Sequence, residues 1–350
     1  MNEQQIQYAT ASDGVRIAYW AVGEGPPLIH MSPMPFSHIQ KEWTLPSLSA
    51  YYEDLASSVR LVRYDCRGAG LSDREVTDFS PEAHARDIFA IADREGFDRF
   101  ALLGFGHSGT IAVHFAAHHP SRVSHLALWC SYPRAADYGR APRVRAIHAI
   151  MDEDWDFWTR AEAFRLSEYE AGPTANWFLE YVRESVTEQG SKAAVIELRK
   201  MDVTSLLPLV QAPTLVLHRT GIAQITIEMA REIAATIPDA RLMLFDGTWI
   251  VPFIGGGGQE IITAIRSFVQ ETPETRAPAA ARLGTASPSL TPRETEVLRL
   301  IAAGLTSGEI SDELSLSVRT VGRHITNIYA KIGARTRADA TAYAFRRRLA

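Results

Sequence analysis

Cysteine is scarce in this sequence, with Cys66 and Cys130 the only two thiols among 350 residues. Two thiols are too few for a disulfide framework or for a cysteine-based metal site. Long apolar runs are absent too, and none reaches the roughly 20 residues that a membrane-spanning helix needs. The chain starts with MNEQQIQYATASDG, which is polar and lacks the basic and then apolar pattern of a secretory signal. We therefore expect a cytoplasmic protein with no membrane partner.

Positive charge is sparse over most of the chain but gathers near its C-terminal end. Residues 288–350 contain ten Lys or Arg and six Asp or Glu, a net charge of +4, whereas the rest of the chain carries −9. A basic segment attached to an acidic body suggests that the segment meets a polyanion. The charge alone fits a solvated basic surface equally well. The motifs of this segment are therefore needed to choose between that surface and a polyanion-binding site.

Length and composition predict more than one domain. At 350 residues, with 46% hydrophobic and 22% charged residues, the chain is an ordinary globular protein that exceeds a typical single domain. Residues 271–289 are rich in Pro, Ala, Thr and Ser and show no hydrophobic period, which is typical of a linker. We expect a large domain over residues 1–270 and a small domain over residues 290–350.

Strand and helix patterns alternate through most of the large domain. Two alternating strands joined at Asp13-Gly14 predict a hairpin. Further strands are expected at residues 26–31, 59–64, 123–130, 213–218 and 241–245, with helices at residues 83–95, 226–237 and 260–269. This order predicts a mostly parallel sheet with helices on both faces. Residues 132–207 break the alternation, because they read as helices rich in aromatic side chains.

A turn motif gives the large domain a family resemblance. The motif lies in residues 102–120, LLGFGHSGTIAVHFAAHHP, and it resembles the strand-to-helix turn that carries the nucleophile of α/β-hydrolases. That turn has the pattern Gly-x-Ser-x-Gly, whose small residues permit a strained backbone. The spacing of Ala112, Ala116 and Pro120 aligns Gly106 with the serine. Residues 65–72, DCRGAGLS, are similar to a structural loop of the same family. The resemblance implies an α/β-hydrolase fold with a helical cap at about residues 132–207.

The resemblance also locates the three positions of the hydrolase triad, and none carries a catalytic side chain. Gly106 stands at the nucleophile, Ile222 at the acid and Ile250 at the base. Acyl transfer needs a nucleophile, a base that takes its proton and an acid that orients the base. In addition, Pro33 removes a backbone N–H from the loop where the family binds the oxyanion. We expect that the domain is not an enzyme.

The turn can also be aligned with the hydrolase pattern in a second register, and this alignment predicts an active enzyme. The pattern Gly106-His107-Ser108-Gly109-Thr110 makes Ser108 the nucleophile of an esterase-like hydrolase tethered to DNA. This register puts the β-branched Thr110 where the turn needs a small residue, and it rotates the helix pattern by about 200°. The chain has no H-E-x-x-H or comparable metal-binding pattern, and we expect neither a metal nor a cofactor.

Loss of the catalytic groups predicts a binding site instead. Apolar residues in place of polar ones make a better site for an apolar molecule and a worse active site. The expected partner is a small apolar or aromatic ligand, oriented by hydrogen bonds from Ser32, His107 or Ser108; a filled core is the alternative. The expected ligand-binding residues are Ser32, Pro33, Met34, Phe36, Phe105, Gly106, His107, Ile222, Trp249 and Ile250.

The small domain carries a second resemblance. Its sequence contains LTPRETEVL at residues 290–298, GLTSGEI at residues 304–310 and SVRTVGRHITNIYAKI at residues 317–332. This pattern resembles the helix-turn-helix DNA-binding domain of LuxR-type regulators over nearly the whole domain. Thr291, Pro292 and Glu294 fit a capped helix start. A second helix at residues 307–314 and a third after Ser317 have the spacing of an all-α helix-turn-helix domain.

The LuxR-type resemblance implies two partners, double-stranded DNA and a second copy of the chain. Pairing is expected through the last helix, residues 337–348, and DNA binding through the third helix. Gly322 departs from the pattern, since the family usually has Lys there, and glycine weakens the helix by about 1 kcal/mol. Expected DNA contacts are Arg319, Arg323 and Asn327 in the groove, and Ser317, Thr320, His324 and Lys331 at phosphates. The sequence thus predicts a homodimeric, ligand-responsive transcription regulator.

Overall fold

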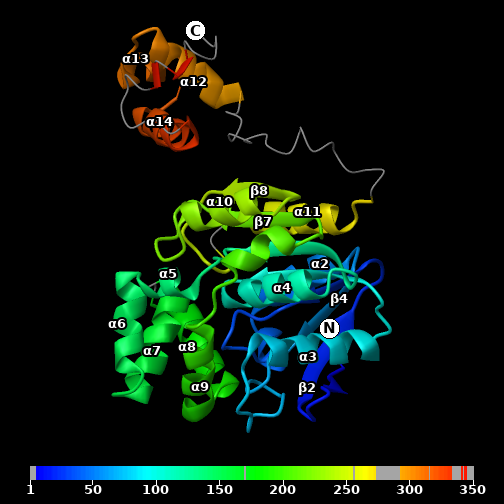
Figure 1. Cartoon of the computed structure of the whole chain (residues 1–350). Helices are drawn as coiled ribbons and strands as arrows, with labels where there is room; N and C mark the ends of the chain where they lie inside the picture. Colours follow the sequence, from blue (N-terminus) through cyan, green and yellow to red (C-terminus); the bar gives the residue numbers. More distant parts are fainter. Residues whose placement is uncertain are drawn as a thin grey trace. The chain divides into compact units, whose positions relative to one another are not determined.

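The alternating apolar segments of the N-terminal part form one eight-stranded sheet in the computed structural model of the chain (Figure 1). The structure describes residues 5–168, 171–254, 257–272, 292–314, 316–332, 340–341 and 343–344. The chain divides into two compact units, residues 1–283 and residues 284–350. Each unit is described separately below.

The strands of the first unit follow the order β1-β2-β4-β3-β5-β6-β7-β8. Strand β2 pairs antiparallel with both β1 and β4, and all other neighbours are parallel. The β1–β2 hairpin turns at Gly14, whose φ of 90° suits glycine. The strands are β1 (Gln7–Thr10), β2 (Arg16–Val22), β3 (Pro27–His30), β4 (Arg60–Tyr64), β5 (Phe100–Phe105), β6 (Val123–Trp129), β7 (Thr214–Arg219) and β8 (Ala240–Phe245).

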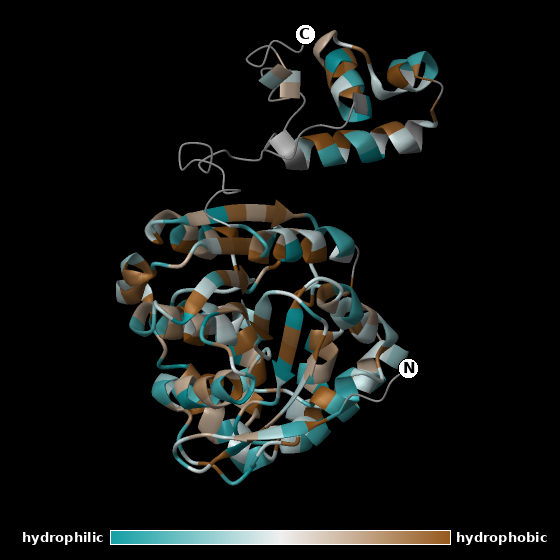
Figure 2. Cartoon of the chain, turned by 90° about the vertical axis from the view of Figure 1, so that its right-hand side faces the viewer, coloured by the Kyte–Doolittle hydropathy of each residue, from teal (hydrophilic) through white to brown (hydrophobic). Residues whose placement is uncertain are grey.

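Helices cover the sheet in two groups. All residues of β5 and β7 are buried, as expected for parallel strands covered on both faces. One group packs α2 (Pro46–Ala56) against α11 (Gly258–Val269). The other contains α3 (Pro81–Arg94), α4 (His107–His118), the short η1 (Thr204–Leu209) and α10 (Ile227–Thr236). Figure 2 shows brown, hydrophobic strand segments in the interior of the unit, and the helices around them carry both brown and teal segments.

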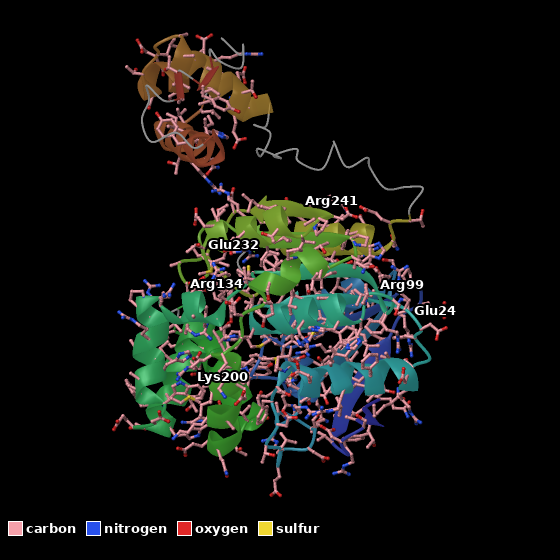
Figure 3. The ribbon with its side chains drawn as sticks, viewed as in Figure 1. Glu24, Arg99, Arg134, Lys200, Glu232 and Arg241 are labelled. Carbon is pink, nitrogen blue, oxygen red and sulfur yellow. The ribbon has the colours of Figure 1, made fainter. Side chains whose placement is uncertain are left out.

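The described α-helices between β6 and β7, α5 to α9, form a cap, seen as the green helices on one side of the unit in Figure 1. Salt bridges attach it to the sheet-bearing part. Lys41 Nζ, on the short α1 (Ile39–Glu42), lies 2.7 Å from Glu184 of the cap, and Arg134 Nη1 lies 2.5 Å from Glu232 of α10 (Figure 3). The cap helices are α5 (Ala135–Gly139), α6 (Pro142–Ile150), α7 (Trp155–Leu166), α8 (Pro173–Ser185) and α9 (Glu188–Leu198).

The second unit is helical. Its described helices are α12 (Pro292–Ala302), α13 (Ser307–Glu313) and α14 (Val318–Ile332). Thr306 and Glu309 form a capping box at the start of α13. The capping residue expected for the first helix, Thr291, lies outside the described residues, as does most of the expected last helix, residues 337–348. The helices enclose a small core of Val297, Leu298, Ile301, Ile310, Val321, Ile328, Ala340 and Ala344.

Candidate functional site

The strand-to-helix turn of the first unit is centred on Gly106. Strand β5 ends at Phe105 and α4 begins at His107, and Gly106 between them has φ 55° and ψ −116°. A Cβ atom on Gly104 would lie 2.6 Å from Gly109 Cα, so the close strand-to-helix packing requires glycine there. Gly106 itself is buried, yet a Cβ atom on it would meet no heavy atom within 4 Å. The position therefore faces an open space inside the unit.

Ser108 does not face that space. Its side chain is fully buried, and Oγ accepts a hydrogen bond from the Phe105 N–H at 2.8 Å and donates one to the Phe105 carbonyl at 3.0 Å. Thr110 Oγ1 in turn donates to the carbonyl of His107 at 2.7 Å. Both hydroxyls are therefore bonded to the backbone of the turn itself.

The open space is a cavity of about 110 Å³ between the strand ends and the cap. This volume far exceeds the about 10–15 Å³ that a single water needs. Helices α5 to α9 all contribute to its lining, together with the segments after β3, β5, β6 and β8. Aromatic walls include Phe36, Phe105, Trp129, Trp158 and Phe178.

The structure brings seven of the ten expected ligand-binding residues to the lining of this cavity. They are Pro33, Met34, Phe36, Phe105, Gly106, His107 and Ile250. The other three are absent from the lining. The Ser32 Oγ donates to the Tyr64 carbonyl at 3.0 Å and accepts a hydrogen bond from Arg63. Ile222 is buried in the surrounding core. The carbonyl of Trp249 accepts a hydrogen bond from Arg219 at 3.0 Å.

A buried ion pair lies in the lining, which sequence reasoning missed. Arg63 Nη2, on β4, lies 2.5 Å from Glu42 Oε1, and both side chains are almost fully buried. The hydroxyls of Tyr52 and Tyr181 donate to Glu42 at 2.7 and 3.0 Å. Burial raises the pKa of both tyrosines well above 10, so they stay protonated donors. The lining is thus more polar than the expected apolar pocket, although this cluster is satisfied internally.

A second charged group belongs to the cap. Arg165 Nη2 lies 2.7 Å from Glu162 on α7, and Arg199, at the end of α9, lines the same cavity. His148 on α6 lies near both arginines, and burial together with their charge lowers its pKa to about 4. Burial also lowers the pKa of His107 to about 3, assisted by His148 and Arg165. These histidines are therefore neutral at pH 7.

His107 is engaged with two aromatic side chains of the cap side. Its Nδ1 shares a hydrogen bond with the Tyr132 hydroxyl, and Tyr132 stacks on Tyr138 with ring centroids 5.1 Å apart. Burial raises the pKa of Tyr132 well above 10. The ring of His107 is therefore oriented by Tyr132. Within the described ranges, no group of three His, Cys, Asp or Glu side chains is placed to hold a metal ion.

In the second unit, α14 presents a polar face. Val321 and Ile328 are buried in the small core, whereas Arg323 and Asn327 are exposed. Ser317 caps the helix, since its Oγ accepts the Thr320 N–H at 3.1 Å. His324 is partly exposed. Arg319 and Lys331 belong to α14, but their side chains lie outside the described part. A Cβ atom on Gly322 would meet nothing within 4 Å.

Comparison with known proteins identifies the second unit. Residues 288–344 match the luxR family of bacterial regulatory proteins. The transcriptional regulatory protein LiaR of Bacillus subtilis is 32% identical over 147 residues, which cover 35% of this chain and 70% of LiaR. The chain belongs to the luxR family. This luxR-family chain is therefore a DNA-binding transcription regulator, and α13 and α14 supply its helix-turn-helix.

The first unit of this luxR-family regulator has the α/β-hydrolase fold, as the sequence predicted. Residues 48–147 match that fold, and the AB hydrolase superfamily protein YisY of Bacillus subtilis is 24% identical over 247 residues, covering 68% of this chain and 90% of YisY. An esterase from Exiguobacterium antarcticum superimposes with a TM-score of 0.66 at 21% identity, over 76% of this chain and all of the esterase. None of the described helices is long and apolar enough to cross a membrane.

Loss of Arg323 in this luxR-family regulator is expected to weaken binding to its DNA site. The guanidinium is exposed on the polar face of α14, where a bidentate base contact contributes about 1–3 kcal/mol. Gel-shift titrations on a site selected from random DNA measure the effect of Arg323→Ala, and we expect a loss of about 5- to 150-fold. Arg299→Ala removes an equal charge from the exposed side of α12 and serves as control. Superimposable titrations of wild type and Arg323→Ala would contradict the expected role.

Proposed function

We propose that the first unit is a catalytically inactive α/β-hydrolase domain that binds a small, largely apolar molecule and controls DNA binding by the second unit. One observation carries the proposal. Gly106 occupies the turn where the fold presents its nucleophile, and the space that a side chain would enter there is an open cavity. The fold thus retains the pocket of an enzyme without the attacking group.

The remaining triad positions support the absence of acyl-transfer chemistry. Ile250, at the position of the base, lines the cavity with an apolar side chain, and Ile222, at the position of the acid, is buried. Ser108, the alternative nucleophile, uses its hydroxyl within the turn. His107 is held by Tyr132 through Nδ1, and burial keeps it neutral. No base therefore hydrogen-bonds the Ser108 hydroxyl, as activation of a serine requires.

The shape and lining of the cavity support a ligand. It is large enough for a small organic molecule rather than a single water, and its aromatic walls suit an apolar or aromatic body. In this proposal, binding of the ligand in the cavity changes the affinity with which a homodimer of the chain binds DNA. A ligand shifts such an equilibrium only by as much as it prefers one of the two states.

An esterase assay separates this proposal from the enzymatic alternative. We expect the purified chain to hydrolyse p-nitrophenyl acetate and longer p-nitrophenyl esters no faster than Ser108→Ala does, because the Ser108 hydroxyl has neither a base nor access to the cavity. Hydrolysis by the wild type that disappears in Ser108→Ala would refute the inactive domain. Circular dichroism of both proteins controls for folding.

A further inference from the structure

One guanidinium group in the described lining of the cavity has no carboxylate partner. The described lining contains two carboxylates, Glu42 and Glu162, and three guanidinium groups, Arg63, Arg165 and Arg199. Arg63 pairs with Glu42 at 2.5 Å and Arg165 pairs with Glu162 at 2.7 Å. Arg199 has no acidic partner among the described residues and is exposed at the end of α9. A further carboxylate, Glu168, lies beside the lining, where it accepts from the Ile250 N–H and interacts with Arg165. Arg199 is therefore distinguished by its lack of an acidic partner rather than by a net charge of the cavity.

Arg199 lies at the cap side of the cavity, beside the paired Arg165 and the neutral His148. Arg199 follows α9, Arg165 lies on α7 and His148 on α6, so three cap helices contribute to this end. The field of Arg199 and Arg165 adds to burial in lowering the pKa of His148. Burial, the larger cause, disfavours charge of either sign, whereas the part due to the two guanidinium groups shows that the field at this end is positive.

The Glu42 end of the cavity offers no comparable charge. Glu42 accepts from Arg63 and from two tyrosine hydroxyls, and Arg63 also donates to the Tyr64 carbonyl at 2.7 Å. Breaking such a buried, hydrogen-bonded pair to engage a ligand is costly. A charged group of the ligand is therefore favoured at Arg199, and the aromatic walls are left for its apolar body.

We infer that the cavity takes an amphipathic monoanion, with an aromatic or aliphatic body and one carboxylate, sulfonate or comparable group that Arg199 binds. This inference rests on the proposed function of the cavity as a ligand site. The planar guanidinium matches such groups with two parallel N–H donors, and charge-assisted hydrogen bonds are about twice as strong as neutral ones. A neutral ligand of equal size leaves the exposed guanidinium of Arg199 to water, gains no ion pair and so binds more weakly.

Two single-ring probes of similar shape test the inference by isothermal titration calorimetry, because a cavity of about 110 Å³ has room for one ring only. Benzoate carries a carboxylate, whereas benzamide has the same aromatic body without a charge. Each is titrated into the full-length wild type and Arg199→Met. Lys200→Met is the matched control, because Lys200, labelled in Figure 3, is the next residue. It pairs with Glu197 at 2.6 Å and is absent from the lining of the cavity. Gly106→Trp, with Gly106→Ala as its control, reports whether the probes occupy the cavity.

We expect Arg199→Met to weaken binding of the anionic probe about two- to fivefold, as loss of an ion pair at an exposed side chain implies, and to leave binding of the neutral probe unchanged. Lys200→Met should change neither. The inference would be overturned if wild type and Arg199→Met bound the anionic probe equally well while Gly106→Trp bound neither probe. The proposed function would then still stand. Failure of the wild type to bind either probe, or binding that Gly106→Trp does not affect, would refute the proposed function and the inference with it.

Discussion

Replacing Gly106 with tryptophan is expected to abolish small-molecule binding by the first unit. A Cβ atom at this buried position meets nothing within 4 Å, so the indole enters the cavity of about 110 Å³ and fills much of it. The substitution has a second effect, because the φ of 55° at Gly106 is unfavourable for a side chain. Strain of this kind costs about 1–3 kcal/mol, which a domain of this size can tolerate.

Gly106→Ala separates the two effects. It introduces the same backbone strain with a single methyl group, so we expect it to lower the melting temperature like Gly106→Trp but to retain ligand binding. Both variants should keep the basal DNA affinity of the second unit. Ligand binding by Gly106→Trp equal to that of Gly106→Ala would place the ligand outside this cavity.

Loss of either partner of the Glu42–Arg63 pair is expected to destabilise the first unit strongly. Removal of one partner from a buried ion pair leaves an uncompensated charge and costs about 3–5 kcal/mol. Arg63→Met leaves the Glu42 carboxylate with tyrosine donors only, and Glu42→Met leaves the guanidinium of Arg63 buried among neutral groups. The double variant removes both charges, so it should recover most of the loss.

Tryptophan fluorescence measures this effect selectively. All seven tryptophans lie within residues 1–283, so urea unfolding followed by their emission reports on the first unit alone. The coupling free energy from the double-mutant cycle is the quantity to compare. Losses below about 1 kcal/mol for both single variants would indicate that the pair is solvated, as exposed ion pairs are.

The sheet and the turn could be predicted because their signals are local in the sequence. Apolar runs such as residues 213–218 become buried parallel strands. Gly104 and Gly109 lack a side chain, which allows the strand and the helix that follows it to pack closely. The helix-turn-helix was equally local, since its core residues recur at helical spacing on α12 and α14. Each of these elements can be predicted from a short, continuous stretch of the sequence.

The charges of the cavity could not be predicted, because their partners come from distant segments. Glu42 precedes α2 whereas Arg63 lies on β4, and Arg199 belongs to the cap, whose helices carry no spacing signal that points to the cavity. The family resemblance also placed Ile222 and Trp249 at the site, yet neither lines the cavity. A family position fixes the strand that a loop follows but not the direction of each side chain in the loop.

Native mass spectrometry of the full-length chain, compared with Gly106→Trp, tests the central claim most directly. We predict that the wild type carries a bound small molecule, that the molecule is absent from Gly106→Trp, and that its addition to stripped wild type changes the affinity for DNA. A wild type that carries no molecule, and whose melting temperature and DNA affinity no small-molecule library changes, would contradict the account. That result would favour a filled hydrolase-fold unit and a regulator controlled by protein partners.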